Sequence, residues 1–119
     1  MNNRGVRYLL FFVFTIFFCQ HLSIAHSVYI FHDGKHPDHI QLFVKLFESK
    51  NFQVDEGTSL PKELNNYDIL LLEYDAYGNP SFDWKKDEVY NYVSSGGIFI
   101  GAGDGGMLAA ISLTNSSTS

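Results

Sequence analysis

The chain has 119 residues, of which 45% are hydrophobic and 18% are charged, and its formal net charge at pH 7 is −5. This length and this apolar content are typical of one globular domain. The acidic balance offers no basic patch for nucleic acid or for an anionic membrane surface, so we expect neither as a partner.

The first 25 residues have the three-part layout of a signal peptide. Arg4 and Arg7 supply positive charge, an unbroken apolar run extends from Tyr8 to Cys19, and small residues stand at the −3 and −1 positions of a cut after Ala25. A membrane-spanning helix needs about 20 apolar residues, which is more than this run contains. We therefore expect cleavage after Ala25, secretion, and no membrane attachment afterwards.

Cleavage after Ala25 would leave residues 26–119, with six lysines against thirteen acidic residues and a net charge of −7. The only cysteine, Cys19, would leave with the signal peptide, so the mature chain would have no disulfide and no thiol nucleophile. We expect one domain over residues 26–113 and a disordered polar tail over residues 114–119. Asn115 begins an Asn-Ser-Ser sequon, which predicts N-glycosylation in that tail.

Short apolar runs alternate with amphipathic segments along the mature chain. Ile40, Phe43, Val44 and Phe47 have the spacing of one helix face, which predicts a helix from Pro37 to about residue 50. We expect strands at 27–31, 52–54, 69–72 and 98–100. The helix from Pro37 follows the first strand, with Asp38 as its N-cap, and a helical turn at 60–64 follows the second. A helix capped by Ser81 or Asp83 and ending at Gly96 follows the third strand, and a tight turn at 101–106 and a helix at 107–113 follow the fourth.

This order predicts an α/β fold, a three-layer flavodoxin-like parallel sheet that is incomplete, with about four strands. In such sheets ligands bind at the carboxyl ends of the strands, so we expect any site in the loops at 32–39, 55–58, 73–80 and 101–107. The partner would be an unidentified protein or a small polar ligand at these ends. An open sheet edge after the fourth strand also predicts self-association.

Three local strings resemble the class I glutamine amidotransferase-like superfamily, in its trehalose-utilisation-like or biotin–protein ligase amino-terminal branches. They are Asn66-Tyr-Asp-Ile-Leu-Leu-Leu72, the helix from Val89 to Gly97, and Gly97-Ile-Phe-Ile-Gly-Ala-Gly-Asp-Gly105. The resemblance covers about residues 27–113. It implies the flavodoxin-like fold, with the third string at the position of the family's nucleophile elbow.

The elbow departs from the family pattern of small-x-Cys-x-small. With Gly101 and Gly105 as its small residues, Gly103 takes the nucleophile position and has no side chain, while a shift by one residue places Asp104 there. The family's catalytic histidine follows the elbow, and no histidine follows Gly106 here. We therefore expect a non-catalytic binding or interaction module, either a shortened relative or a truncated piece of a larger amidotransferase-like protein.

Carboxylates at the strand ends suggest an alternative function. Asp104 with Glu73 or Asp33 would give the pair of acids that hydrolyses glycosidic bonds, so a hydrolase, acting on carbohydrate, is the main rival hypothesis.

The same loops suggest two kinds of ligand site. The turn with Gly101, Gly103, Gly105 and Gly106 precedes a helix and would suit an anion, although its simpler role is to allow a tight strand-to-helix connection. His32, His36 and Asp33 are donors that suit a divalent metal, although a polar loop has the same composition. We predict no other cofactor.

Overall fold

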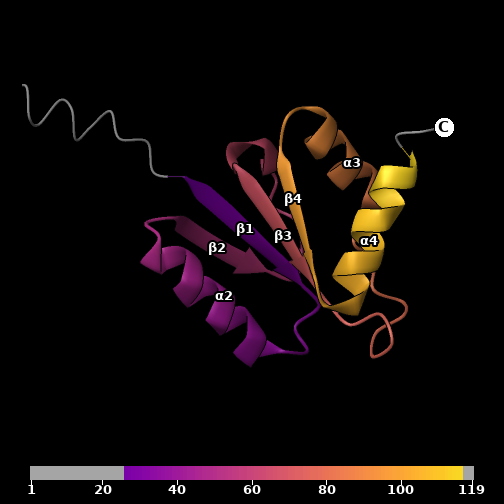
Figure 1. Ribbon diagram of the computed structural model, residues 1–119, viewed down its shortest axis with the longest axis horizontal. Helices are drawn as coiled ribbons and strands as arrows, with labels where there is room; N and C mark the ends of the chain where they lie inside the picture. Colours follow the sequence, from indigo (N-terminus) through magenta and orange to yellow (C-terminus); the bar gives the residue numbers. More distant parts are fainter. Residues whose placement is uncertain (1–25, 117–119) are drawn as a thin grey trace, which may run out of the picture.

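The structure is a computed structural model, and it describes residues 26–116. The predicted signal peptide and the last three residues of the predicted tail lie outside this range. The described elements are β1 (Ser27–His32), α2 (Pro37–Ser49), β2 (Gln53–Gly57), the 3₁₀ helix η1 (Leu64–Asn66), β3 (Ile69–Glu73), α3 (Lys86–Ser94), β4 (Ile98–Ala102) and α4 (Gly103–Ser116) (Figure 1).

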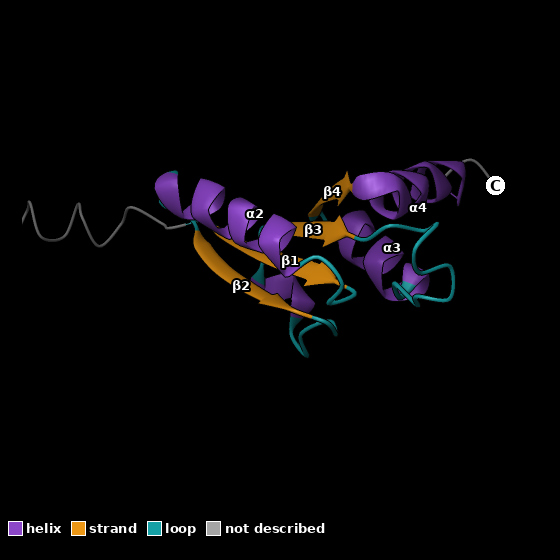
Figure 2. Cartoon of the chain, turned by 90° about the horizontal axis from the view of Figure 1, so that it is seen from below, coloured by secondary structure: helices purple, strands orange, loops and turns teal. Residues whose placement is uncertain are grey.

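The four strands form one parallel sheet in the order β2-β1-β3-β4. Helix α2 covers β1 and β2 on one face, and α3 lies on the opposite face (Figure 2). The two central strands are apolar on both faces because helices or neighbouring strands cover them on every side. The predicted fold class, a three-layer flavodoxin-like domain with an incomplete sheet, is confirmed.

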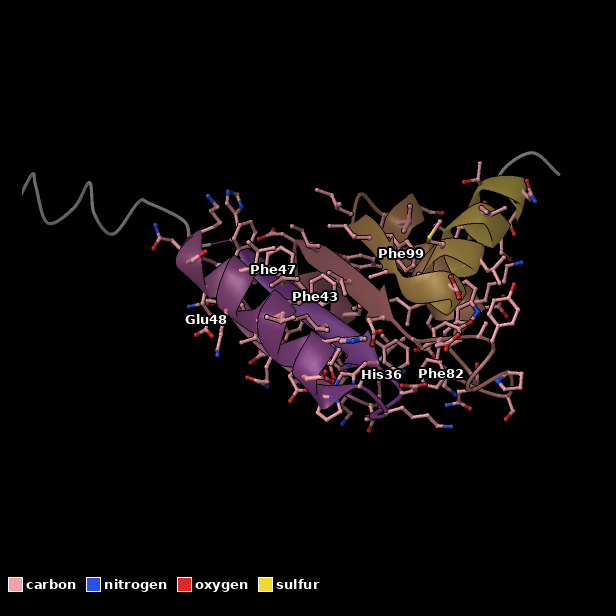
Figure 3. The ribbon with its side chains drawn as sticks, turned by 60° about the horizontal axis from the view of Figure 1, so that its bottom comes forward. His36, Phe43, Phe47, Glu48, Phe82 and Phe99 are labelled. Atoms are coloured by element: carbon pink, nitrogen blue, oxygen red, sulfur yellow. The ribbon has the colours of Figure 1, made fainter. Side chains whose placement is uncertain are left out.

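Alternate side chains of the central strands belong to two cores. Tyr29, Phe31, Leu70 and Leu72 pack with Val89 of α3 and with Ala109 and Leu113 of α4. On the other face Val28, Ile30 and Leu71 pack under α2, whose Ile40 is buried and whose Phe43 and Phe47 point toward the sheet (Figure 3). The predicted apolar face of α2 is therefore the face that it buries.

Strand β2 is longer than the sequence indicated. It runs from Gln53 to Gly57, so Asp55 and Glu56 are strand residues and not the start of a loop at residue 55. An edge strand needs hydrogen bonds to only one neighbour, and its exposed side chains can be charged without cost. The acidic residues that indicated a loop instead mark the outer edge of the sheet.

Two predicted helix caps are wrong. Helix α2 begins at Pro37, with His36 in the N-cap position, and Asp38 lies in its first turn without capping it. Helix α3 begins at Lys86, after Lys85 in a left-handed conformation. The Asp83 carboxylate accepts the N–H of Lys85, 3.0 Å away, and so stabilises the turn that precedes the helix.

The helix predicted after Ser81 or Asp83 would include Trp84, but in the structure Trp84 precedes α3. Its half-buried ring packs against Phe99 of β4, with the ring centroids 6.4 Å apart. The predicted helical turn at 60–64 is likewise displaced, since the 3₁₀ helix covers residues 64–66.

Helix α4 begins four residues earlier than expected and continues three residues further. It starts at Gly103, directly after β4, so the predicted turn at 101–106 is divided between a strand and a helix. Residues 114–116 are helical, which corrects the predicted start of the disordered tail, and Asn115 lies exposed in the last helical turn. Close packing explains the early start, because a Cβ on Gly101 would lie 2.1 Å from the carbonyl oxygen of Gly106.

Within residues 26–116, none of the helices combines the length and the apolar character that crossing a bilayer requires.

Candidate functional site

A hollow of about 510 Å³ lies where α2 meets the carboxyl ends of β3 and β4. One wall is apolar and consists of Leu42, Phe43 and Leu46 from α2. Leu42 and Leu46 are 68% and 54% exposed, although they are large apolar side chains. Phe43 also packs against the sheet, whereas Leu42 and Leu46 lie outside the buried face of α2 and leave this wall open to solvent.

Glu73 is the buried acid of this hollow. It is the last residue of β3, pairs in register with His32 of β1 and Ala102 of β4, and is 5% exposed. Its Oε1 atom lies 3.7 Å from Nδ1 of His39, and its Oε2 atom has no hydrogen-bond partner among residues 26–116. A buried carboxylate oxygen without a partner is costly, so a hydrogen-bond donor from solvent or from a ligand would stabilise it.

Two further acids line the hollow. Asp104 lies exposed in the first turn of α4, and Asp75 follows β3 and accepts the N–H of Tyr77 at 3.0 Å. His36 and His39 are the basic groups of the lining; their rings stack with centroids 5.0 Å apart, and His36 stands at the start of α2 (Figure 3). Three carboxylates in one hollow favour a cationic group over an anionic one.

The glycine-rich junction of β4 and α4 contributes Ala102, Gly103 and Asp104 to the lining of the hollow. Gly103 has a φ of 75°, and the N–H of Gly105 donates to the Tyr74 carbonyl at 3.0 Å. Burial, followed by the charge of Asp33, raises the pKa of the Tyr74 hydroxyl above its usual value. Because one amide of the turn is already bonded and Glu73 and Asp104 stand beside it, this turn disfavours the anion predicted at Gly101, Gly103, Gly105 and Gly106.

The predicted metal donors are directed to different neighbours. The Nε2 atom of His32 pairs with Glu56 across the sheet, and its Nδ1 atom accepts the N–H of Gly34 at 3.0 Å. Asp33 accepts the side-chain amide of Asn79, while His36 stacks on His39. In the described part of the chain no three such side chains come together as a metal site.

The structure brings together two of the three predicted catalytic acids. Glu73 and Asp104 line the hollow, whereas Asp33 does not, because the loop after β1 turns its carboxylate toward Lys35 and Asn79. The sequence placed His39 in a candidate loop at 32–39 without giving it a role, and it did not lead us to expect the apolar wall. Leu42 and Leu46 do give a signal in the sequence, because they are apolar residues outside the predicted buried face of α2.

The chain is an α/β domain with a hollow of about 510 Å³ at the carboxyl ends of its parallel strands. Comparison of the chain with models of known protein families, with characterised proteins and with solved structures found no match. The resemblance to the amidotransferase-like superfamily therefore stays a prediction from the sequence.

Proposed function

We propose that the chain is a secreted, non-catalytic binding module whose ligand is a small amphipathic cation held in the hollow at the strand ends. The observation that carries this proposal is the buried Oε2 atom of Glu73, which has no partner among the described residues. A ligand ammonium group would supply the missing donor and would neutralise the acidic lining.

The apolar wall would bind the hydrocarbon part of the ligand. Leu42, Phe43 and Leu46 stand beside the carboxylates, so a hydrocarbon chain attached to the ammonium group would lie along α2. Each methylene group removed from water would contribute about 0.8 kcal/mol. The volume of about 510 Å³ is within the range of small-molecule sites.

A series of six-carbon probes tests the proposal. Hexylamine, hexan-1-ol and hexanoate share one apolar chain and differ in the charge of the head group. Differences in their affinities therefore report the contribution of that charge to binding. We expect hexylamine to shift the backbone amide NMR signals of residues 36–46 and 102–106 with a Kd of about 1 mM, hexan-1-ol to bind more weakly, and hexanoate to cause no saturable shift. Equal binding of hexanoate would contradict the proposal.

The hydrolase reading rests on Glu73 and Asp104, which share the hollow. Two carboxylates of a glycosidase stand on either side of the bond that they cleave, and one of them acts as the acid. In a binding module, Asp104→Asn should lower the affinity for hexylamine only about two- to fivefold, because Asp104 is exposed and screened by solvent. Hydrolysis of nitrophenyl glycosides by the wild-type chain and its loss in Asp104→Asn would instead establish the enzyme.

A further inference from the structure

The two edges of the sheet differ in chemistry. Edge strand β2 carries Asp55 and Glu56, whereas edge strand β4 reads Ile98-Phe-Ile-Gly-Ala102 and has no charge and no proline. Charged side chains and proline are the usual features that keep an edge from pairing with another strand. Strand β4 therefore lacks the features that usually prevent an edge strand from pairing.

The backbone groups that point away from β3 can be assigned. The N–H of Ile98 donates to the Asp68 carbonyl at 3.2 Å, so Ile98 and, by alternation, Ile100 and Ala102 direct their backbone groups toward β3. Phe99 and Gly101 direct theirs outward. The outer edge of β4 thus presents two N–H and two C=O groups without a neighbouring strand among residues 26–116.

We propose that β4 pairs with β4 of a second copy of the chain, antiparallel and about a two-fold axis at Ile100, to form one continuous eight-stranded sheet. In this register Phe99 of each copy faces Gly101 of the other, and the two pairs exchange four hydrogen bonds. These bonds satisfy every outward group of both β4 strands. A register centred one residue away would leave some of them unpaired.

The side chains fit the same register. Ile100 of one copy lies opposite Ile100 of the other, and Ile98 lies opposite Ala102 of the other copy, so the contacting side chains are apolar. Ile98 and Ile100 are 55% and 38% exposed in the single chain. Asp104 lies opposite Gly96, so the register brings no like charges into contact although the chain is acidic. A two-fold axis normal to the sheet also places both α4 helices on one face, where each carries exposed Met107, Leu108 and Ile111.

Cysteine cross-linking tests the register directly. In the full chain carrying Cys19→Ser, the variant Ile100→Cys provides the only thiol. At the two-fold axis the two residues form a non-hydrogen-bonded pair with a Cα separation of about 4.5 Å, within the range of a disulfide. Mild oxidation should convert most of this variant into a covalent dimer.

Ile98→Cys is the matched control, because it is an exposed isoleucine on the same strand and the same face. In the proposed register it lies about 13 Å from its counterpart, since the two are offset by four residues, and it should cross-link at least tenfold more slowly. Equal rates for the two variants, or a monomer by light scattering without cross-linking of Ile100→Cys, would overturn the proposal.

A charged variant provides a second test that does not depend on a disulfide. Ile100→Lys places two like charges at the axis and should give a folded monomer, with unchanged circular dichroism and half the mass by light scattering. Leu42→Lys alters an exposed leucine away from the edge and should leave the dimer intact. A dimer that persists in Ile100→Lys would show that another surface, or another strand, mediates the association.

Discussion

Replacing Gly101 by alanine is expected to lower the free energy of unfolding by about 3 kcal/mol or more, at the upper end of the range for overpacked sites. The added Cβ would lie 2.1 Å from the carbonyl oxygen of Gly106 and 2.6 Å from its carbonyl carbon. Both are backbone atoms of α4, so the contact can be relieved only by moving the helix away from β4. Thermal unfolding should occur about 12 °C or more below that of the wild type.

Gly78→Ala is the control for this variant. A Cβ there would first meet the carboxylate of Asp75 at 3.2 Å, which is the end of a flexible side chain. We expect a change of about 0.5 kcal/mol or less. If Gly101→Ala were as stable as Gly78→Ala, α4 would not cross β4 as closely as described.

Replacing Glu73 by methionine is expected to raise the free energy of unfolding by about 1–3 kcal/mol and to abolish binding of hexylamine. The stability gain follows from removing a buried carboxylate with an unpartnered oxygen and substituting an apolar side chain of similar length. The loss of binding follows because the proposed ligand pairs with that oxygen. Urea unfolding and an NMR titration of the same variant measure the two effects.

Glu48→Met provides the comparison, since Glu48 is an exposed acid of α2 that points away from the sheet (Figure 3). Its effect on stability should stay within about 0.5 kcal/mol, and the binding of hexylamine should not change. A Glu73→Met variant that is less stable than the wild type would mean that Glu73 holds the fold together and is not kept for a ligand.

Strands and helices with one dominant periodicity were predictable from the sequence. The apolar run of β3 and the i, i+3, i+4, i+7 spacing of α2 correspond to a central strand and a helix with one buried face. The beginning of α4 was not predictable in this way. Its first turn contains three glycines, which local propensity disfavours in a helix, and tertiary packing against β4 requires them.

The location of the candidate site was predictable from the direction of the parallel strands. The rule that ligands bind at the carboxyl ends of parallel strands selected Glu73 and Asp104, and both line the hollow. It also selected Asp33 and His32, whose side chains turn elsewhere. His32 pairs with Glu56 only because β2 extends to Gly57 beside β1, and this pairing of two distant segments leaves no local pattern in the sequence.

The position of bound hexylamine tests the central claim most directly. Intermolecular nuclear Overhauser effects, measured on the wild-type chain at saturation, report which protons lie beside the ligand. The proposed binding mode predicts contacts from the terminal methyl group to Leu42 and Leu46, and from the methylene beside the nitrogen to Ala102 and His39. Contacts to another surface, or the same contacts from hexanoate, would contradict a cation site built around Glu73.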